Sequence, residues 1–222
     1  MTSPSIPSRG RPARLDRAKT VETALELLDD VGLEALTMRR LAERLGVRAG
    51  ALYRHFTTKQ DLLTAMAERM LGDVHASPEA ADWAGRLRAL ARALRRALLA
   101  HRDGARVFGG THSVGPHTLA FAESVVGVLR EAGFGDEDAG RTLMALVNFT
   151  LGHTLEEQAA VAPREDGAPD DPGRLRSAVL AGPYPHLAAT VPVLTSADFD
   201  AHFEFALDLQ VEGLRRLRSG AG

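Results

Sequence analysis

Hydrogen-bond donors crowd one short stretch of the chain, residues 37–59. Arginine, lysine, tyrosine, histidine and threonine side chains can bond phosphate oxygens, and arginine can also read base edges. In this stretch they are interleaved with leucine and alanine at helical spacing. The stretch therefore predicts a surface that contacts nucleic acid. The residues expected on that surface are Thr37, Arg39, Arg48, Ala49, Ala51, Tyr53, Arg54, His55 and Lys59.

Two short helices joined by a turn are expected to hold these side chains. Thr37 can cap a helix over residues 38–45. Gly46 then supplies a turn, and residues 49–56 resume the helical pattern. This is a helix–turn–helix layout, whose second helix fits the DNA major groove. The spacing alone also allows a helical hairpin with a solvated basic face. The apolar positions expected between the two helices are Leu41, Leu45, Leu52 and Phe56.

The charge of the chain is divided unevenly. Over all 222 residues, 27 Lys and Arg against 29 Asp and Glu give a net charge of −2, which argues against a nucleic-acid binder. Residues 1–59, however, hold 11 basic and 7 acidic side chains, which leaves 16 basic and 22 acidic for the remainder. This asymmetry predicts an N-terminal unit that binds a polyanion and an acidic body with another task. Residues 1–15 are expected to be a flexible basic arm.

Helical periodicity runs through the whole chain and predicts an all-α fold. The first helix is expected to end at Gly32, as helices often do at glycine. The expected domains are a helix–turn–helix unit at 16–60 and a helical body at 61–218, which begins with a connecting helix at 61–75. Residues 162–173, rich in proline and glycine, predict a mobile loop. Further helices are expected over 83–101, 117–132, 136–161 and 197–218, with a short one near 173–181.

Composition narrows the class of protein. Apolar residues at 45% and charged residues at 25% are ordinary globular values. The absence of Cys excludes disulfides and thiolate chemistry. No apolar run approaches the roughly 18 residues that span a bilayer, and no signal-peptide core is present at the N-terminus. A cytoplasmic location is therefore expected.

The first unit also resembles a known family. The segments ALELLDDVGLEALTMRRLAERLGV and ALYRHFTTKQDLL, within residues 16–71, are similar to the DNA-binding domain of the tetracycline-repressor (TetR) family of bacterial regulators. The segments LLAHRDGARVFGGTH at 98–112 and FTLGHTLEEQ at 149–158 resemble the body of tetracycline repressor itself. The resemblance implies a homodimeric transcriptional repressor that leaves a palindromic operator when a small molecule binds its body.

The resemblance further implies that helices 136–161 and 197–218 form the dimer interface. The last helix carries an apolar stripe that fits this role, although a monomer could bury the same stripe internally. The stripe consists of Phe199, Phe203, Leu207, Val211 and Leu214.

By the same resemblance, the body holds the ligand site. Where the family's namesake ligates a magnesium–drug chelate through a histidine, this chain has Phe108, which cannot ligate a hard cation. We therefore expect no magnesium and no other cofactor, and a largely apolar cavity for a multi-ring, antibiotic- or polyketide-like molecule. The alternative is a true magnesium–tetracycline sensor that controls an efflux gene, with His112 as the ligand. The residues expected to bind the molecule are His75, Leu90, Leu94, Phe108, Thr111, His112, Phe121, Met144, Asn148 and Glu156.

Each residue of this set also has a plain structural explanation. The apolar members, such as Leu90 and Phe108, could belong to an ordinary core. His75 and His112 could be exposed turn residues, and Glu156 could face solvent.

Catalysis is not expected. His153 lies one helical turn from Glu156 and Glu157, a spacing that can ligate metal in helical bundles, but no second such pair recurs. Nucleophile-elbow and phosphate-loop motifs are absent from the sequence. No catalytic residue is therefore predicted, and a structural helical adaptor would not need the basic helix–turn–helix.

Overall fold

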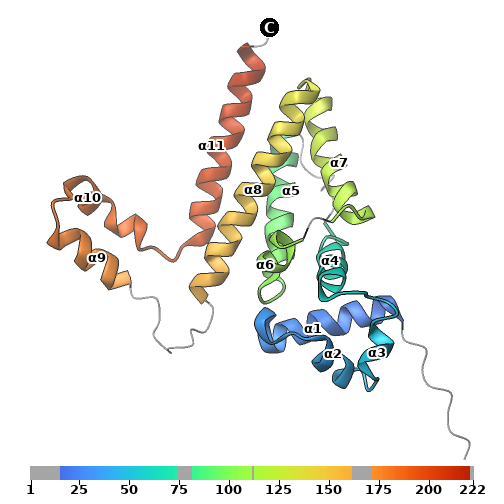
Figure 1. Cartoon of the computed structure of the whole chain (residues 1–222). Coiled ribbons are helices and arrows are strands. Elements are labelled where there is room, and N and C mark those ends of the chain that lie inside the picture. The colour runs from blue at the N-terminus through green and yellow to red at the C-terminus, as the bar shows by residue number, and fades with distance from the viewer. Residues whose placement is uncertain (1–15, 75–81, 112, 162–171, 221–222) are drawn as a thin grey trace, which may run out of the picture.

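The computed structural model describes residues 16–74, 82–111, 113–161 and 172–220 (Figure 1). Within these ranges the chain forms eleven α-helices and no strand, which confirms the predicted all-α class. The predicted basic arm, residues 1–15, and most of the predicted loop at 162–173 lie outside the described residues. The helices are α1 Arg17–Ala35, α2 Met38–Arg44, α3 Ala49–Leu52, α4 Lys59–Met70, α5 Trp83–Leu99, α6 Gly104–Gly109, α7 Pro116–Glu131, α8 Asp136–Val161, α9 Pro172–Ala181, α10 Pro185–Leu194 and α11 Phe199–Gly220.

Two separate apolar cores divide the molecule into a head and a body. The head core joins α1, α2, α3 and α4, and the body core joins α5, α7, α8 and α11. Helix α4 connects the two, because Leu62 and Met66 lie in the head core whereas Leu71, just beyond the helix, lies in the body core. Figure 1 shows the head below the body, with α4 between them. Among the described residues, none of the helices is long and apolar enough to cross a membrane.

Local signals set the ends of the head helices. Asp16 caps α1 by accepting the amide of Ala18. Gly32, predicted to end this helix, instead forms a kink inside it with φ +77°, and α1 ends at Ala35. Thr58 and Asp61 form a capping box at the start of α4, in which each side chain accepts the other's amide. These caps fix where α1 and α4 begin.

Two helices were not predicted, and one is shorter than predicted. Helix α6 has glycine at both ends and only six residues, and α10 contains Pro192, so neither shows a clear apolar period. Helix α3 ends at Leu52 rather than at residue 56. The amide of His55 donates to the carbonyl of Leu52 in a tight turn, which carries Phe56 into the head core.

Helices α9 and α10 form a hairpin arm that projects away from the rest of the chain (Figure 1). They pack against each other, and several of their large apolar side chains are exposed. These exposed side chains are Leu175, Leu180, Tyr184, Leu187, Val193 and Leu194.

Candidate nucleic-acid interface and its link to the body

The helix–turn–helix is built from α2, the turn at Gly46, and α3. Thr37 caps α2 by accepting the amide of Arg40, and Gly46 takes φ +66°, a conformation that suits glycine in a tight turn. Leu41, Leu52 and Phe56 are at most 1% exposed, so the predicted core between the two helices is present. The core fixes which face of α3 points outward.

Donors of the predicted interface flank α3 on both sides in the chain. Arg48, Tyr53, Arg54 and His55 are exposed, with 51% of Tyr53 accessible. Within the described residues, Arg48 and Arg54 have no carboxylate partner, so their guanidinium groups are available to an anion. Arg39 is exposed but pairs with Glu43 at 2.9 Å, one turn along α2.

The remaining predicted contact residues make hydrogen bonds within the chain or are half-buried. Lys59 is half-buried, and its Nζ donates to the carbonyl of Leu33 at 3.3 Å, at the end of α1. Ala49 and Ala51 are half-buried on α3, and Thr37 serves as the cap of α2. Besides Thr37, the exposed members of the predicted set are therefore Arg39, Arg48, Tyr53, Arg54 and His55, whereas Lys59 and Thr37 have structural roles. The DNA-binding role of the set stays a prediction.

The structure does not gather the predicted ligand residues around one cavity of the described chain. Leu90 and Leu94 are wholly buried in the body core, and Phe121 is 3% exposed. Met144, by contrast, is 58% exposed, and Asn148 and Glu156 are also exposed along α8. His75 and His112 lie outside the described residues, so the ligand-binding role of the set stays a prediction.

Phe108 lies where the head and body cores meet. The ring is half-buried and packs against both apolar clusters. It offers no donor atom to a metal, and the hydroxyl of the neighbouring Thr111 donates to the Phe108 carbonyl at 2.9 Å. The Phe108 side chain therefore cannot ligate a magnesium ion, which prefers oxygen ligands, and the expected absence of magnesium stays a prediction.

The largest contacts between head and body run through α4 and the turn before α6. Helix α6 packs on α4, and Val107 of α6 is buried in the head core. The carboxylate of Asp103 accepts the amide of Leu33 at 2.8 Å, and Asp29 accepts the amide of Arg102 at 2.8 Å. Displacement of the body near α6 would therefore move the end of α1 and the start of α4.

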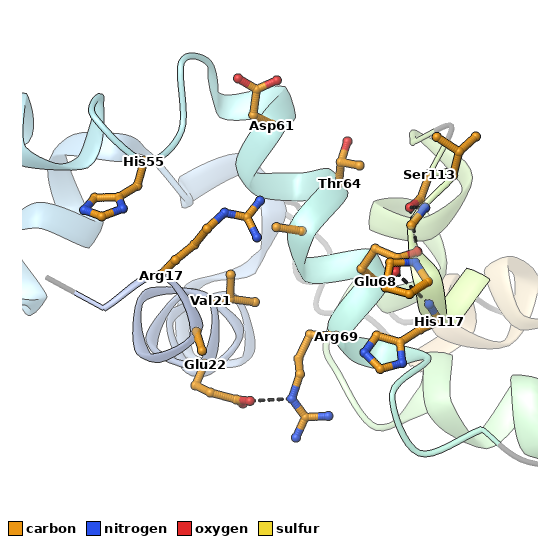
Figure 2. A pocket seen from close by; sticks show the side chains of 15 residues that line it. Arg17, Val21, Glu22, His55, Asp61, Thr64, Glu68, Arg69, Ser113 and His117 are labelled. Carbon is orange, nitrogen blue, oxygen red and sulfur yellow. Dashed lines mark hydrogen bonds and ion pairs between the residues drawn. The ribbon is translucent and has the colours of Figure 1, made fainter. Parts of the chain in front are cut away.

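A cleft of about 780 Å³ opens on the other side of α4, between α1 and the segment that enters α7 (Figure 2). Of the predicted DNA-contacting residues, His55 lines it. Figure 2 shows Glu22 paired with Arg69 across its floor and Glu68 turned toward Ser113 and His117. Sequence reasoning missed Glu68, because its partners lie about fifty positions along the chain.

Glu157 forms a buried ion pair with Arg95, and His153 lies beside this pair. Arg95 donates to both carboxylate oxygens of Glu157, at 2.9 and 2.8 Å, and to Asp200 of α11 at 2.6 Å. Burial, together with the Arg95 cation, lowers the pKa of the neighbouring His153, so its imidazole is neutral at neutral pH. The His–Glu spacing noted in the sequence therefore serves the packing of α5, α8 and α11.

Comparison with known proteins decides the family. Residues 21–66 match the model of bacterial regulatory proteins of the tetR family, and residues 75–218 match that of the tetracyclin repressor-like C-terminal domain. The chain belongs to the TetR family. It is accordingly a regulator with a DNA-binding head and not an enzyme.

Relatives of this TetR-family chain cover nearly its full length. Tetracycline repressor protein class C of Escherichia coli is 42% identical over 92% of this chain and 93% of its own length. The crystal structure of a possible TetR family transcriptional regulator from Streptomyces coelicolor A3(2) is 63% identical, with a TM-score of 0.83, and covers 91% of this chain and 100% of that one. The S. coelicolor protein ActR in complex with actinorhodin is 32% identical, with a TM-score of 0.81, over 91% of this chain and 96% of its own.

Proposed function

We propose that this TetR-family regulator is a homodimeric repressor that binds a palindromic operator and releases it when a small molecule binds the body. The observation that supports the proposal most directly is the exposed donor face of the helix–turn–helix, where Arg48 and Arg54 have no partner in the described chain. The head is joined through α4 and α6 to a separate body core. A change in the body therefore has a physical route to the DNA-binding face.

The proposed dimer forms through α8 and α11, which lie side by side in the body (Figure 1). The inner stripe of α11, including Phe203 and Leu207, is buried within its own body. Its outer face still exposes Phe205 by 68% and Leu209 by 59%, and α8 exposes Met144 by 58%. Apolar side chains at this density favour burial against a second copy of the chain.

The exposed arm extends the same proposal. Leu187 and Val193 of α10, like Leu175 of α9, present apolar surface to solvent in the single chain. The arm starts from the end of α11 that lies nearest the head (Figure 1). In the dimer it would lie against the partner, where this apolar surface is buried.

Dimer geometry explains how a ligand can release DNA. Two recognition helices must lie about 34–36 Å apart to enter successive major grooves on one face of the duplex. A molecule that binds the body more tightly when the two helices are at another separation will stabilise that conformation. The DNA affinity then falls in proportion to the molecule's preference for that conformation. Release needs no chemical reaction.

We propose a multi-ring, antibiotic- or polyketide-like effector that binds without magnesium. Phe108 supports this proposal, because it places a ring rather than a metal ligand at the junction of the head and the body. An aromatic neighbour favours flat, apolar molecules through stacking and dispersion.

A release assay with and without a chelator tests the effector proposal. The complex with a duplex selected by the protein is titrated with actinorhodin, and separately with tetracycline, each in magnesium and in excess EDTA. We expect a multi-ring compound to release the duplex equally well in both conditions. Release that requires tetracycline and is abolished by EDTA would instead establish the magnesium-dependent alternative.

A further inference from the structure

Helix α7 begins without a cap of its own. The residue at its N-cap position is Gly115, which has no side chain to accept the first free amides, and Pro116 follows at the first helical position. Elsewhere in the chain, Asp16, Thr37, Thr58 and Asp82 fill this role for their own helices. Helices α3, α6 and α10 also lack a side-chain cap, but the first turn of α7 finds its acceptors on another helix.

Glu68 of the connecting helix supplies them. Its Oε2 accepts the amide of His117 at 3.0 Å, and its Oε1 accepts the amide of Thr118 at 3.2 Å. The hydroxyls of Ser113, at 2.6 Å, and of Thr118 donate to the same carboxylate. These amides are the second and third of the helix, which an N-cap side chain ordinarily binds.

Gly115 leaves space for the Glu68 carboxylate, but it has no side chain to cap α7 itself. A Cβ atom on Gly115 would lie 2.3 Å from the carboxyl carbon of Glu68, so any larger residue would displace the carboxylate. Burial alone would raise the pKa of Glu68, but the bonds from Ser113, Thr118 and the two amides outweigh it and lower the pKa. The ionised carboxylate also interacts favourably with the positive end of α7.

The contact joins elements that belong to different cores. Helix α4 packs Leu62 and Met66 into the head, whereas α7 packs Phe121 and Val125 into the body. We propose that Glu68 is a positioning residue that transmits motion between body and DNA-binding head by capping α7 from the connecting helix. The proposal rests on the proposed function, and it assigns one link in the coupling between operator and effector.

The test measures this coupling from the DNA side, so that no effector is required. A duplex is first selected from a random pool by the wild-type protein. Hydrogen exchange of the α7 amides at His117 and Thr118 is then measured in the full-length protein with and without saturating duplex. Coupling between two sites is reciprocal. A contact through which the body changes the DNA affinity of the head must therefore also let DNA binding at the head change the body.

Two variants separate a coupling role from a merely structural cap. Glu68→Ala removes the carboxylate, and Glu68→Ala combined with Gly115→Ser gives α7 a local serine cap in the space that Glu68 vacates. Glu131→Ala is the matched control, because it removes an ion pair with Arg86 at the opposite end of the same helix.

We expect the duplex to slow exchange of these amides about tenfold in the wild type and in Glu131→Ala, a typical coupling between sites. In both Glu68 variants the response to DNA should fall below about twofold. Without DNA, the double variant should regain the protection that Glu68→Ala loses, because the serine restores the cap.

Three results would overturn the proposal. A full response to DNA in Glu68→Ala would show that other contacts carry the coupling, and no response in the wild type would show that none reaches α7. A full response in the double variant would show that Glu68 is only a cap. If the wild-type protein selects no duplex at all, the proposed function is wrong and the proposal about Glu68 is wrong as well. This outcome differs from the other three, in which the protein does bind a duplex.

Discussion

The exposed donors of the head differ in how firmly the fold holds them. Arg48 and Arg54 lie at the two ends of α3 and are exposed, and within the described chain neither has an anionic partner. Lys59 is anchored to the carbonyl of Leu33 and Arg39 to Glu43. The free arginines are therefore expected to contribute most to electrostatic DNA binding, since they lose no protein contact when they meet a phosphate.

Replacement of Arg54 by alanine tests this assignment. The loss of one phosphate contact in each subunit of the proposed dimer should lower the magnitude of the slope of log affinity against log salt by about 1.8, at about 0.9 per contact, with little change in stability. Affinity for the selected duplex is measured by fluorescence anisotropy across a salt series. Arg130→Ala is the control, because Arg130 is an exposed arginine at the far end of α7. Equal slopes in Arg54→Ala and the wild type would remove Arg54 from the interface.

At the scale of elements, the sequence predicts the long helices and the short helices α2 and α9, but it misses α6 and α10. Helices α1, α5, α7, α8 and α11 each keep an apolar stripe over sixteen or more residues, so their period is readable. Helix α6 has only six residues, and its placement depends on contacts with α4 that local sequence does not encode. The cap of α7 by Glu68 and the pairing of Arg95 with Glu157 are equally long-range, so residue type alone could not predict them.

Helix α11 is held on the body by a ladder of arginines on α5. Arg88, Arg92 and Arg95, spaced at about one turn, pair with Asp208, Glu204 and Asp200 of the antiparallel α11. The middle arginine is the most solvated, because the Arg92 side chain is 42% exposed, whereas those of Arg88 and Arg95 are 17% and 11% exposed. The Asp200 and Asp208 partners on α11 are exposed, and the buried pair is the one that Arg95 also forms with Glu157 of α8, whose side chain is 16% exposed.

Replacement of Arg95 by alanine should destabilise the protein by about 3 kcal/mol, because it leaves the carboxylate of Glu157 buried without its partner. Arg92→Ala, which breaks the solvated pair with Glu204, should cost at most about 1 kcal/mol. Chemical denaturation followed by circular dichroism measures both, at one protein concentration because dimers unfold in a concentration-dependent way. Equal losses in the two variants would contradict the assigned burial of the Arg95 pair.

For the whole molecule, the outer faces of α8 and α11 and the apolar arm leave large apolar side chains exposed in the single chain. Phe205 is the most exposed of three large apolar side chains on the outer face of α11, at 68%, with Leu209 and Leu217. Phe205→Glu should yield a monomer, since a carboxylate in a buried apolar interface is strongly unfavourable. Light scattering coupled to size-exclusion chromatography measures the change.

The same variant should bind the selected duplex about 100-fold more weakly, because the two heads no longer bind as a linked pair. Leu119→Glu is the control, since Leu119 of α7 is exposed to a similar degree, 56%, outside the proposed interface. A dimeric Phe205→Glu protein with unchanged affinity would place the interface elsewhere.

The division of charge along the chain agrees with this arrangement of the molecule. The basic excess lies in residues 1–59, and the acidic excess lies in the remainder, which includes the body. An acidic body repels the phosphate backbone and so favours approach through the head.

Selection of duplexes from a random pool by the purified wild-type protein tests the central claim most directly. A homodimeric repressor of this fold should enrich a palindrome whose half-sites are centred about 10–10.5 base pairs apart, or a multiple of that spacing. Enrichment of a single asymmetric site, or of no sequence, would contradict a dimer that reads operator DNA through two helix–turn–helix heads.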